Sequence, residues 1–180
     1  MPKYYSRKEI FLRMLWVVIE SIFFRCSPRI FYGWRNFILR LMGSRIGKHV
    51  HIFPSARIMY PWLFEIGDRS VISWDVKVYN LGKILIGNNT VISQYSHLCG
   101  GTHDYESTNF TLLPKGLTIG SNVWIGADAF IGPGVTVHDG VVVAARSVVV
   151  RDIPSLTVVA GNPARPIKKL EIVPPMLYPD

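Results

Sequence analysis

The sequence predicts an all-β protein whose main body is a parallel β-helix of about five triangular turns, preceded by helices. An aliphatic residue recurs at every sixth position in five groups of three. The next residue is often small, and a small or β-branched residue is common four places after the aliphatic one. This period is typical of a β-solenoid in which three short strands form one turn. The fifteen aliphatic positions are Ile46, Ile52, Ile58, Ile66, Ile72, Val78, Ile86, Ile92, Leu98, Ile119, Ile125, Ile131, Val137, Val143 and Val149.

In such a solenoid the aliphatic side chains point inward, and the small neighbours let the chain turn sharply at each corner. Stacked turns then bury one continuous apolar column, which supplies most of the stability. An ordinary β-sandwich would have to keep one register through all fifteen positions, so we reject that alternative. The period does not reveal the handedness of the coil.

The largest break in the repeat follows the third turn. Residues 104–118 contain Asn109, Pro114 and Gly116, and we expect them to form a loop that leaves the helix directly after His103. Loops on a rigid scaffold often carry functional residues. The sequence thus divides into a helical segment (1–45), the β-helix with its inserted loop (46–154) and a C-terminal tail (155–180).

The composition is that of a folded protein of ordinary domain size. The 180 residues are 49% hydrophobic and 18% charged, which excludes a mainly disordered chain. Two cysteines, Cys26 and Cys99, are too few for a disulfide framework, and we expect both to be reduced.

The net charge of +8 comes from the N-terminal quarter. Residues 1–48 contain ten basic and two acidic residues, whereas the remainder contains ten of each. The excess therefore describes a local surface and does not indicate a nucleic-acid-binding protein.

Two apolar stripes at helical spacing predict two helices in this basic segment, between Phe11 and Phe23 and between Ile30 and Met42. Arg13, Glu20 and Arg25 interrupt the first stripe, which excludes a spanning helix, and we expect no secretory signal. A basic helix rich in Trp and Phe suits a membrane interface, and it equally suits a cap over the open end of the β-helix. Both interpretations remain open.

Several stretches make the sequence similar to a known family. They are Trp34-Arg35 through Ile46-Gly47, Tyr60-Pro61-Trp62, Tyr79-Asn80-Leu81-Gly82, Gly101-Thr102-His103-Asp104-Tyr105, Val123-Trp124-Ile125-Gly126-Ala127 and Ala160-Gly161-Asn162-Pro163-Ala164-Arg165. Over about residues 10–170 the chain resembles the hexapeptide-repeat acyltransferases, and most closely their colanic acid biosynthesis type within the maltose and galactoside O-acetyltransferase group.

The resemblance implies a left-handed β-helix, a homotrimer with active sites between subunits, and acetyl-CoA as acyl donor. The acceptor would be a hydroxyl of a saccharide, such as a lipid-linked precursor of a surface polysaccharide, in the cytoplasm or on the inner membrane face. His103 matches the catalytic histidine, which acts as general base because a hydroxyl is a weak nucleophile unaided. His97, one hexapeptide earlier, is the best internal rival.

Two residues are candidates for acceptor binding. Asn80 precedes His103 by one turn plus two inserted residues and matches the family's acceptor asparagine, although it also suits a turn. Asp104 would orient His103 or contact the acceptor. Many relatives have proline at this position, so the aspartate favours the polysaccharide-type branch.

The resemblance also implies a groove for coenzyme A. Its members are Trp124 as a cover, the backbones of Ala127 and Ala145, Val150 and Arg151 at the next corner, and Arg165 and Lys168 near the nucleotide. Packing at a corner explains Trp124 equally well. Val150 replaces the more usual threonine, so a side-chain hydrogen bond is lost there.

Three other functions fit less well. A zinc enzyme on this scaffold needs three converging histidines, which the spacing does not provide, so we expect no metal. A covalent route through Cys99 has no activating neighbour. A noncatalytic scaffold bound to a membrane complex is the main alternative, but it has no need of His103, the loop and the groove pattern together.

Overall fold

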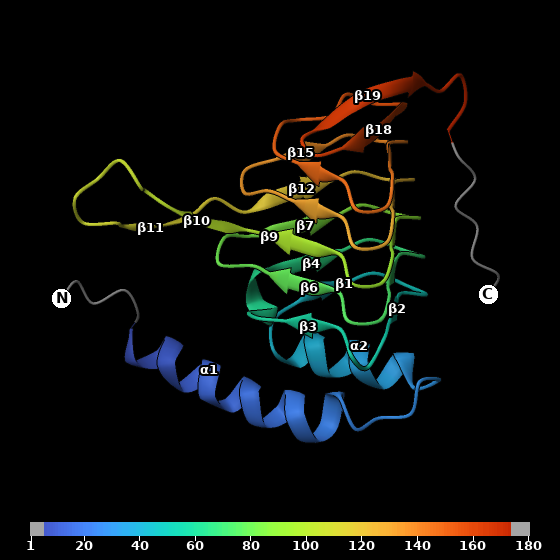
Figure 1. Ribbon diagram of the computed structural model, residues 1–180. Helices are drawn as coiled ribbons and strands as arrows, with labels where there is room; N and C mark the ends of the chain where they lie inside the picture. The colour runs from blue at the N-terminus through green and yellow to red at the C-terminus, as the bar shows by residue number, and fades with distance from the viewer. Residues whose placement is uncertain (1–5, 174–180) are drawn as a thin grey trace.

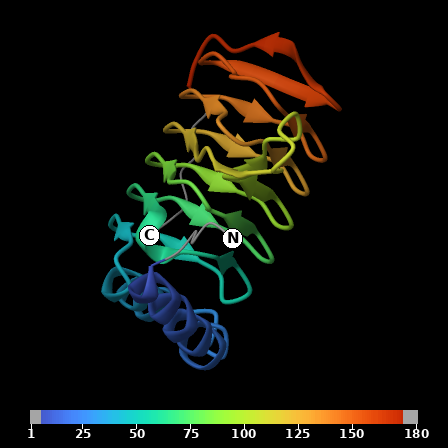
Figure 2. The same ribbon diagram turned by 90° about the vertical axis from the view of Figure 1, so that its left-hand side faces the viewer.

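The computed structural model describes residues 6–173, so residues 1–5 and the end of the predicted tail, 174–180, lie outside the described part. Two helices lie at one end of a stack of triangular β turns (Figures 1 and 2). They are α1 (Arg7–Ile19), continued by a π-helical turn (Glu20–Phe24), and α2 (Tyr32–Leu41). The helices predicted from the two apolar stripes are therefore present.

Three parallel sheets form the sides of the triangle. The first contains β1 (Arg45–Ile46), β4 (Phe64–Ile66), β7 (Ile84–Ile86), β12 (Leu117–Ile119) and β15 (Thr136–Val137). The second contains β2 (His51–Ile52), β5 (Val71–Ile72), β8 (Val91–Ile92), β13 (Trp124–Ile125), β16 (Val142–Val143), β18 (Thr157–Gly161) and β19 (Ala164–Lys169). The third contains β3 (Arg57–Ile58), β6 (Lys77–Tyr79), β9 (His97–Cys99), β14 (Phe130–Ile131) and β17 (Val148–Val149).

The number of turns is slightly larger than predicted. Five turns are complete, and a sixth begins where Ile153 bridges Val137 and β18 pairs with β16. Strand β19 then folds back antiparallel on β18 and ends the second sheet.

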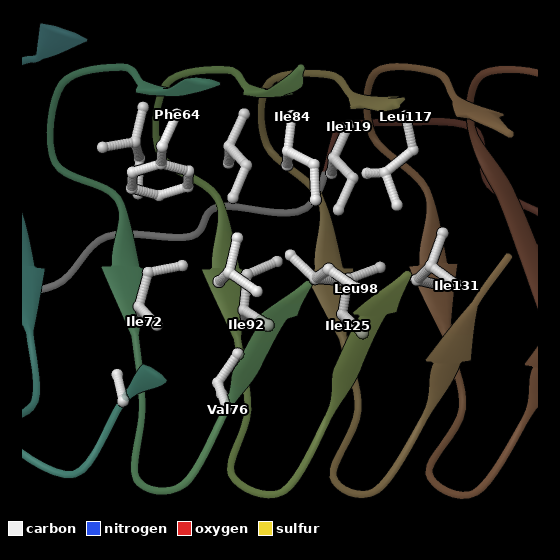
Figure 3. Packing of buried hydrophobic residues seen from close by; sticks show 14 of the residues in the cluster. Phe64, Ile72, Val76, Ile84, Ile92, Leu98, Leu117, Ile119, Ile125 and Ile131 are labelled. Carbon is white, nitrogen blue, oxygen red and sulfur yellow. The ribbon is translucent and has the colours of Figure 1, made fainter. Parts of the chain in front are cut away.

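The aliphatic column is present as the repeat predicts. All fifteen positions are buried, and none is more than 9% exposed. Phe64, Ile84 and Leu117 add a further row inside the first sheet (Figure 3). The spacing of the repeat widens from six to eight positions between Ile58 and Ile66 and between Val78 and Ile86. The three-residue strands β4 and β7 accommodate these insertions and place an extra side chain in the core.

The corners between the first and second sheets explain the small residue after the aliphatic one. Asp68, Asn88, Ser121 and Asp139 lie one above another, and each side chain accepts a hydrogen bond from a backbone N–H of the preceding turn, at 2.7–3.0 Å. A Cβ at Gly120 would lie 2.2 Å from Asp139 Oδ1. The ladder therefore leaves no room for a larger residue there.

The helices cap the open end of the first turn. Within the stack, the carbonyls of the repeat positions accept N–H groups of the preceding turn, as Ile66 O accepts from Gly47 N at 2.9 Å. The first turn has no preceding strands, so these carbonyls need other donors. Ile46 O accepts from Arg40, Ile52 O from Arg35 Nε at 2.6 Å, and Ile58 O from Trp16 Nε1 at 2.7 Å. One side chain thus caps each of the three sheets.

Candidate active site

A β-hairpin arm projects from the corner between the third and first sheets (Figure 1). Strand β10 (Gly101–His103) pairs antiparallel with β11 (Leu112–Pro114), and His103 lies opposite Leu112. The sequence suggested an insertion over 104–118. In the structure the arm already begins at Gly101, and β12 rejoins the stack at Leu117. His103 is therefore part of the arm and not the residue before it.

Glycines at the base of the arm let the chain leave the stack and return. Gly100 O accepts N–H groups from both Gly82 and Gly116, each at 3.0 Å. Gly116 has φ +64°, and a Cβ there would lie 2.3 Å from Lys83 O. Only glycine fits this close approach of two chain segments.

His103 is exposed on the arm and is held by Phe110. Its Nδ1 lies 2.9 Å from Phe110 O, and the two rings stack with centroids 4.2 Å apart and planes 11° from parallel. A carbonyl only accepts, so this bond fixes the tautomer with the proton on Nδ1. Nε2 then has a free lone pair and can take a proton from a substrate.

Sequence reasoning missed Phe110. Its backbone has φ +46°, which brings its carbonyl and ring back to His103 across the loop. An aromatic residue seven places after the histidine was the available signal, but no periodic pattern marks it.

Asp104 contributes to the arm through its backbone. Its N–H donates to Thr111 O at 2.8 Å, and its carbonyl accepts from Ser107 N at 3.3 Å. In the described part of the chain Phe110, and not the Asp104 carboxylate, makes the orienting bond to His103. The side chain of Asp104 is half-buried beside His103, and a contact with the acceptor stays a prediction.

Asn80 is fully buried at the same corner, one turn below the arm. Its Oδ1 accepts from Tyr60 N at 3.0 Å, and its Nδ2 donates to Tyr60 O at 2.6 Å. The amide thus links two successive turns of the β-helix. A role of Asn80 in acceptor binding is not tested by these contacts and stays a prediction.

The predicted coenzyme A residues lie on different parts of the stack. Trp124 is 45% exposed on β13, and its Nε1 donates to Ser93 Oγ at 3.0 Å. Ala127 and Ala145 lie directly above each other at the corner between the second and third sheets, where Arg146 N donates to Ala127 O at 2.8 Å. The remaining four are exposed, with Val150 and Arg151 at the arm's corner and Arg165 and Lys168 on β19.

The third sheet separates His103 from the alanine corner within one chain. The arm leaves after β9, whereas the alanine corner precedes β14 and β17 of the same sheet.

His97, the rival base, has a different environment. It lies on β9 in a groove of about 500 Å³ between α1 and the third sheet, with Tyr79 and Phe130 edge-on to its ring. Burial, and secondarily the Lys77 ammonium, lower the pKa of His97 below 6.5. Its ring is packed on two sides, whereas His103 is exposed on the arm.

Neither a disulfide nor a metal-binding group occurs among residues 6–173. Cys99 Sγ lies 3.2 Å from Gly101 O, at the base of the arm, and both cysteines are free thiols. Among residues 6–173, no group of three or more His, Cys, Asp or Glu side chains could hold a metal ion.

Comparison with known proteins decides the family. Residues 116–151 match the model described as bacterial transferase hexapeptide (six repeats). The chain is 44% identical over 168 residues to "Putative colanic acid biosynthesis acetyltransferase WcaF" of Escherichia coli K12, covering 93% of this chain and 92% of that protein. The chain belongs to the hexapeptide-repeat acyltransferases. The predicted family and enzyme class are thereby confirmed.

Solved structures agree with this assignment. A maltose O-acetyltransferase from Clostridium difficile 630 is 29% identical with a TM-score of 0.84, over 93% of this chain and 90% of that one. A hexapeptide-repeat acetyltransferase from Vibrio cholerae, complexed with acetyl coenzyme A, is 26% identical with a TM-score of 0.83, over 93% and 91%. These similarities confirm the left-handed parallel β-helix.

Proposed function

We propose that this acyltransferase moves an acetyl group from acetyl-CoA to a hydroxyl of a saccharide, with His103 as general base. The observation that carries the proposal is the bond from His103 Nδ1 to Phe110 O, which leaves Nε2 free on an exposed arm. The relative named for colanic acid biosynthesis supports a polysaccharide precursor as acceptor, and a lipid-linked one is the form we favour.

His103 acts twice in this proposal. Nε2 takes the proton of the acceptor hydroxyl as its oxygen attacks the thioester carbonyl. The resulting imidazolium then gives that proton to the thiolate of coenzyme A as the carbon–sulfur bond breaks. Phe110 O stabilises the imidazolium because it remains an acceptor for Nδ1–H throughout.

The acetyl-CoA site would run between two copies in a homotrimer. The small Ala127 and Ala145 leave space for a pantetheine arm at their corner, and Trp124 covers it from the side. Arg165 and Lys168 supply exposed cations for the phosphates. In this proposal the protein takes acetyl-CoA from the cytoplasm, so we expect the protein to be in the cytoplasm. We expect no nucleic acid as a partner.

Release of free coenzyme A from acetyl-CoA, measured with a panel of saccharides, tests the reaction. His103→Ala should lower kcat by about 10²- to 10⁴-fold with little change in the KM for acetyl-CoA. His138→Ala is the matched control, because His138 is an exposed histidine at a corner away from the arm. Equal rates for the native protein and His103→Ala would refute the assigned base. Failure to bind acetyl-CoA would return the scaffold alternative.

A mixing experiment tests the shared site. His103→Ala lacks the base, and Ala145→Trp fills the groove, so each variant alone should be inactive. A mixed trimer pairs an intact arm from one variant with an intact groove from the other, and part of the activity should return after subunit exchange. No recovery in exchanged trimers would mean that one chain supplies both parts.

A further inference from the structure

The outward face of the N-terminal helices is apolar. Thirteen of the twenty-three exposed large apolar side chains in residues 6–173 lie between residues 10 and 41. They are Ile10, Phe11, Met14, Leu15, Val17, Val18, Ile22, Phe23, Ile30, Phe31, Trp34, Phe37 and Leu41. Val17 lines the groove between α1 and the third sheet, and we call the other twelve the outer helical face.

The outer helical face is continuous across both helices. Trp34 Nε1 of α2 donates to Phe23 O at 2.9 Å, and Trp34 stacks on Phe37 with centroids 6.1 Å apart. Ile22, Phe23, Phe31 and Trp34 line a shallow hollow of about 400 Å³ where the helices meet. Figures 1 and 2 show both helices at the same end of the β-helix.

The fold itself does not need this face. Trp16, Phe24, Arg35 and Leu39 are the buried side chains that join the helices to the first turn. The exposed side chains lie on the sides of the helices that face away from the first turn. Positions 11, 14, 15, 18 and 22 follow the helical period along α1 and its π-helical turn, and positions 34, 37 and 41 follow it along α2. An apolar area of this extent, exposed and contiguous, marks an interaction surface.

The charge around the face selects the partner. Arg7, Lys8 and Arg25 are exposed in this segment, whereas Glu20 is half-buried and Glu9 is bonded to Ser6 in the α1 cap. Arg29 instead lies over the rings of Phe53 and Trp74, and Arg45 pairs with Glu65 at 3.4 Å. Two copies joined through this face would bring like charges together. An anionic lipid surface would instead attract the nearby Lys and Arg side chains.

We propose that the outer helical face lies in the interface of a bilayer that contains anionic lipids, with α1 and α2 parallel to the membrane plane. Apolar side chains enter the boundary between headgroups and acyl chains, and the arginines and lysines contact the headgroups. No helix among the described residues is long and apolar enough to cross the bilayer. The β-helix would then stand on the membrane, with the arm carrying His103 held above it. The proposal rests on this surface and is independent of the reaction proposed above.

Vesicle flotation tests the proposal. The full chain should bind vesicles of phosphatidylcholine with 30% phosphatidylglycerol at least tenfold more strongly than pure phosphatidylcholine vesicles, and less strongly in high salt. The variant Phe11→Ser/Phe23→Ser/Leu41→Ser should lose binding. Ile167→Ser is the matched control, because Ile167 is 65% exposed on β19, at the opposite end of the molecule.

A second readout does not depend on the stability of the triple variant. Lipids brominated near the headgroup should quench part of the tryptophan fluorescence of the native protein, and Trp34→Phe should remove most of that quenching. Binding that is absent, or equal for neutral and anionic vesicles, would overturn the proposal. So would quenching unchanged by Trp34→Phe. Self-association through the face would instead appear as a smaller assembly size for the triple variant in the absence of lipid.

Discussion

The interior of the β-helix is aliphatic, whereas the helical cap buries charged and amide side chains as well as apolar ones. In the β-helix the aliphatic residues point inward, and polar ladders occupy the corners. In the cap, Arg35 and Asn36 are buried against backbone carbonyls, while Trp34, Phe37 and Leu41 are exposed. This difference in buried side chains arises because the two regions differ in the backbone groups that lie next to them. A turn inside the stack finds its hydrogen bonds in the next turn, but the first turn can find donors only in side chains.

The largest expected effect is at Arg35. Its guanidinium donates to Ile52 O, Ser27 Oγ, Pro28 O and Arg29 O, and it is 0% exposed. Arg35→Leu should lower the free energy of unfolding by about 4 kcal/mol, because three carbonyls lose a buried donor. Denaturant unfolding measures this. Arg45 is a highly exposed arginine of β1, and Arg45→Leu should change the free energy of unfolding by no more than about 0.5 kcal/mol. Similar values for the two would mean that the cap does not need its buried arginine.

A leucine pair compares the two regions directly. Leu98→Ala removes a fully buried side chain of the column and should cost about 3 kcal/mol, from lost burial and the cavity left behind. Leu41→Ala removes a side chain that is 70% exposed on the cap and should change stability by about 0.5 kcal/mol or less. Thermal or urea unfolding of both variants measures the two changes in stability. A large loss at Leu41 would show that the outer helical face is covered in the free protein.

The ladder of side chains at the corners between the first and second sheets should contribute less per residue to the free energy of unfolding. Asn88 Oδ1 accepts from Asp68 N at 2.7 Å, and Asn88→Ala should cost about 1 kcal/mol for that bond. Asn88→Asp should recover most of the loss, because Asp68 and Asp139 use a carboxylate oxygen for the same purpose in other turns. If the aspartate variant is as unstable as the alanine variant, the ladder bond is not the cause.

The smallest expected effect is a dependence of stability on pH through His97. Burial and Lys77 lower the pKa of His97 in the folded state below 6.5, so the unfolded state binds the proton more tightly. The contribution of neutral His97 to the free energy of unfolding is therefore fully present above pH 6.5. It is lost as the pH falls from 6.5 toward the pKa of His97 in the folded state. His51, whose pKa is lowered by burial and then by His49, acts in the same direction. Unfolding measured between pH 5 and 8 should vary less for His97→Gln. An unchanged slope would contradict the assignment.

The sequence alone determined the β-helix, because its repeat records one buried position per strand. Every turn stacks on a copy of itself, so a period of six fixes which side chains point inward without knowledge of distant contacts. For the same reason the insertion after the third turn could be predicted from the sequence, whereas His103 as general base was implied by the resemblance to the family. Asn80 shows the limit of this reasoning, since its spacing is compatible with a site, whereas its bonds to Tyr60 appear only in the folded chain.

Only the tertiary structure decided the orientation of the helices and the setting of His103. The apolar stripe of the first helix could have faced the β-helix, yet Trp16 and Phe24 at its margin are buried, and Phe11, Met14 and Val18 are exposed. Arg35 is among the most buried residues, because its guanidinium donates to Ile52 O, a carbonyl of the first turn. Phe110 reaches His103 through a turn in the arm. Helical and repeat periods report what a segment can bury, but which face it does bury depends on the unpaired backbone groups that the rest of the chain presents to it.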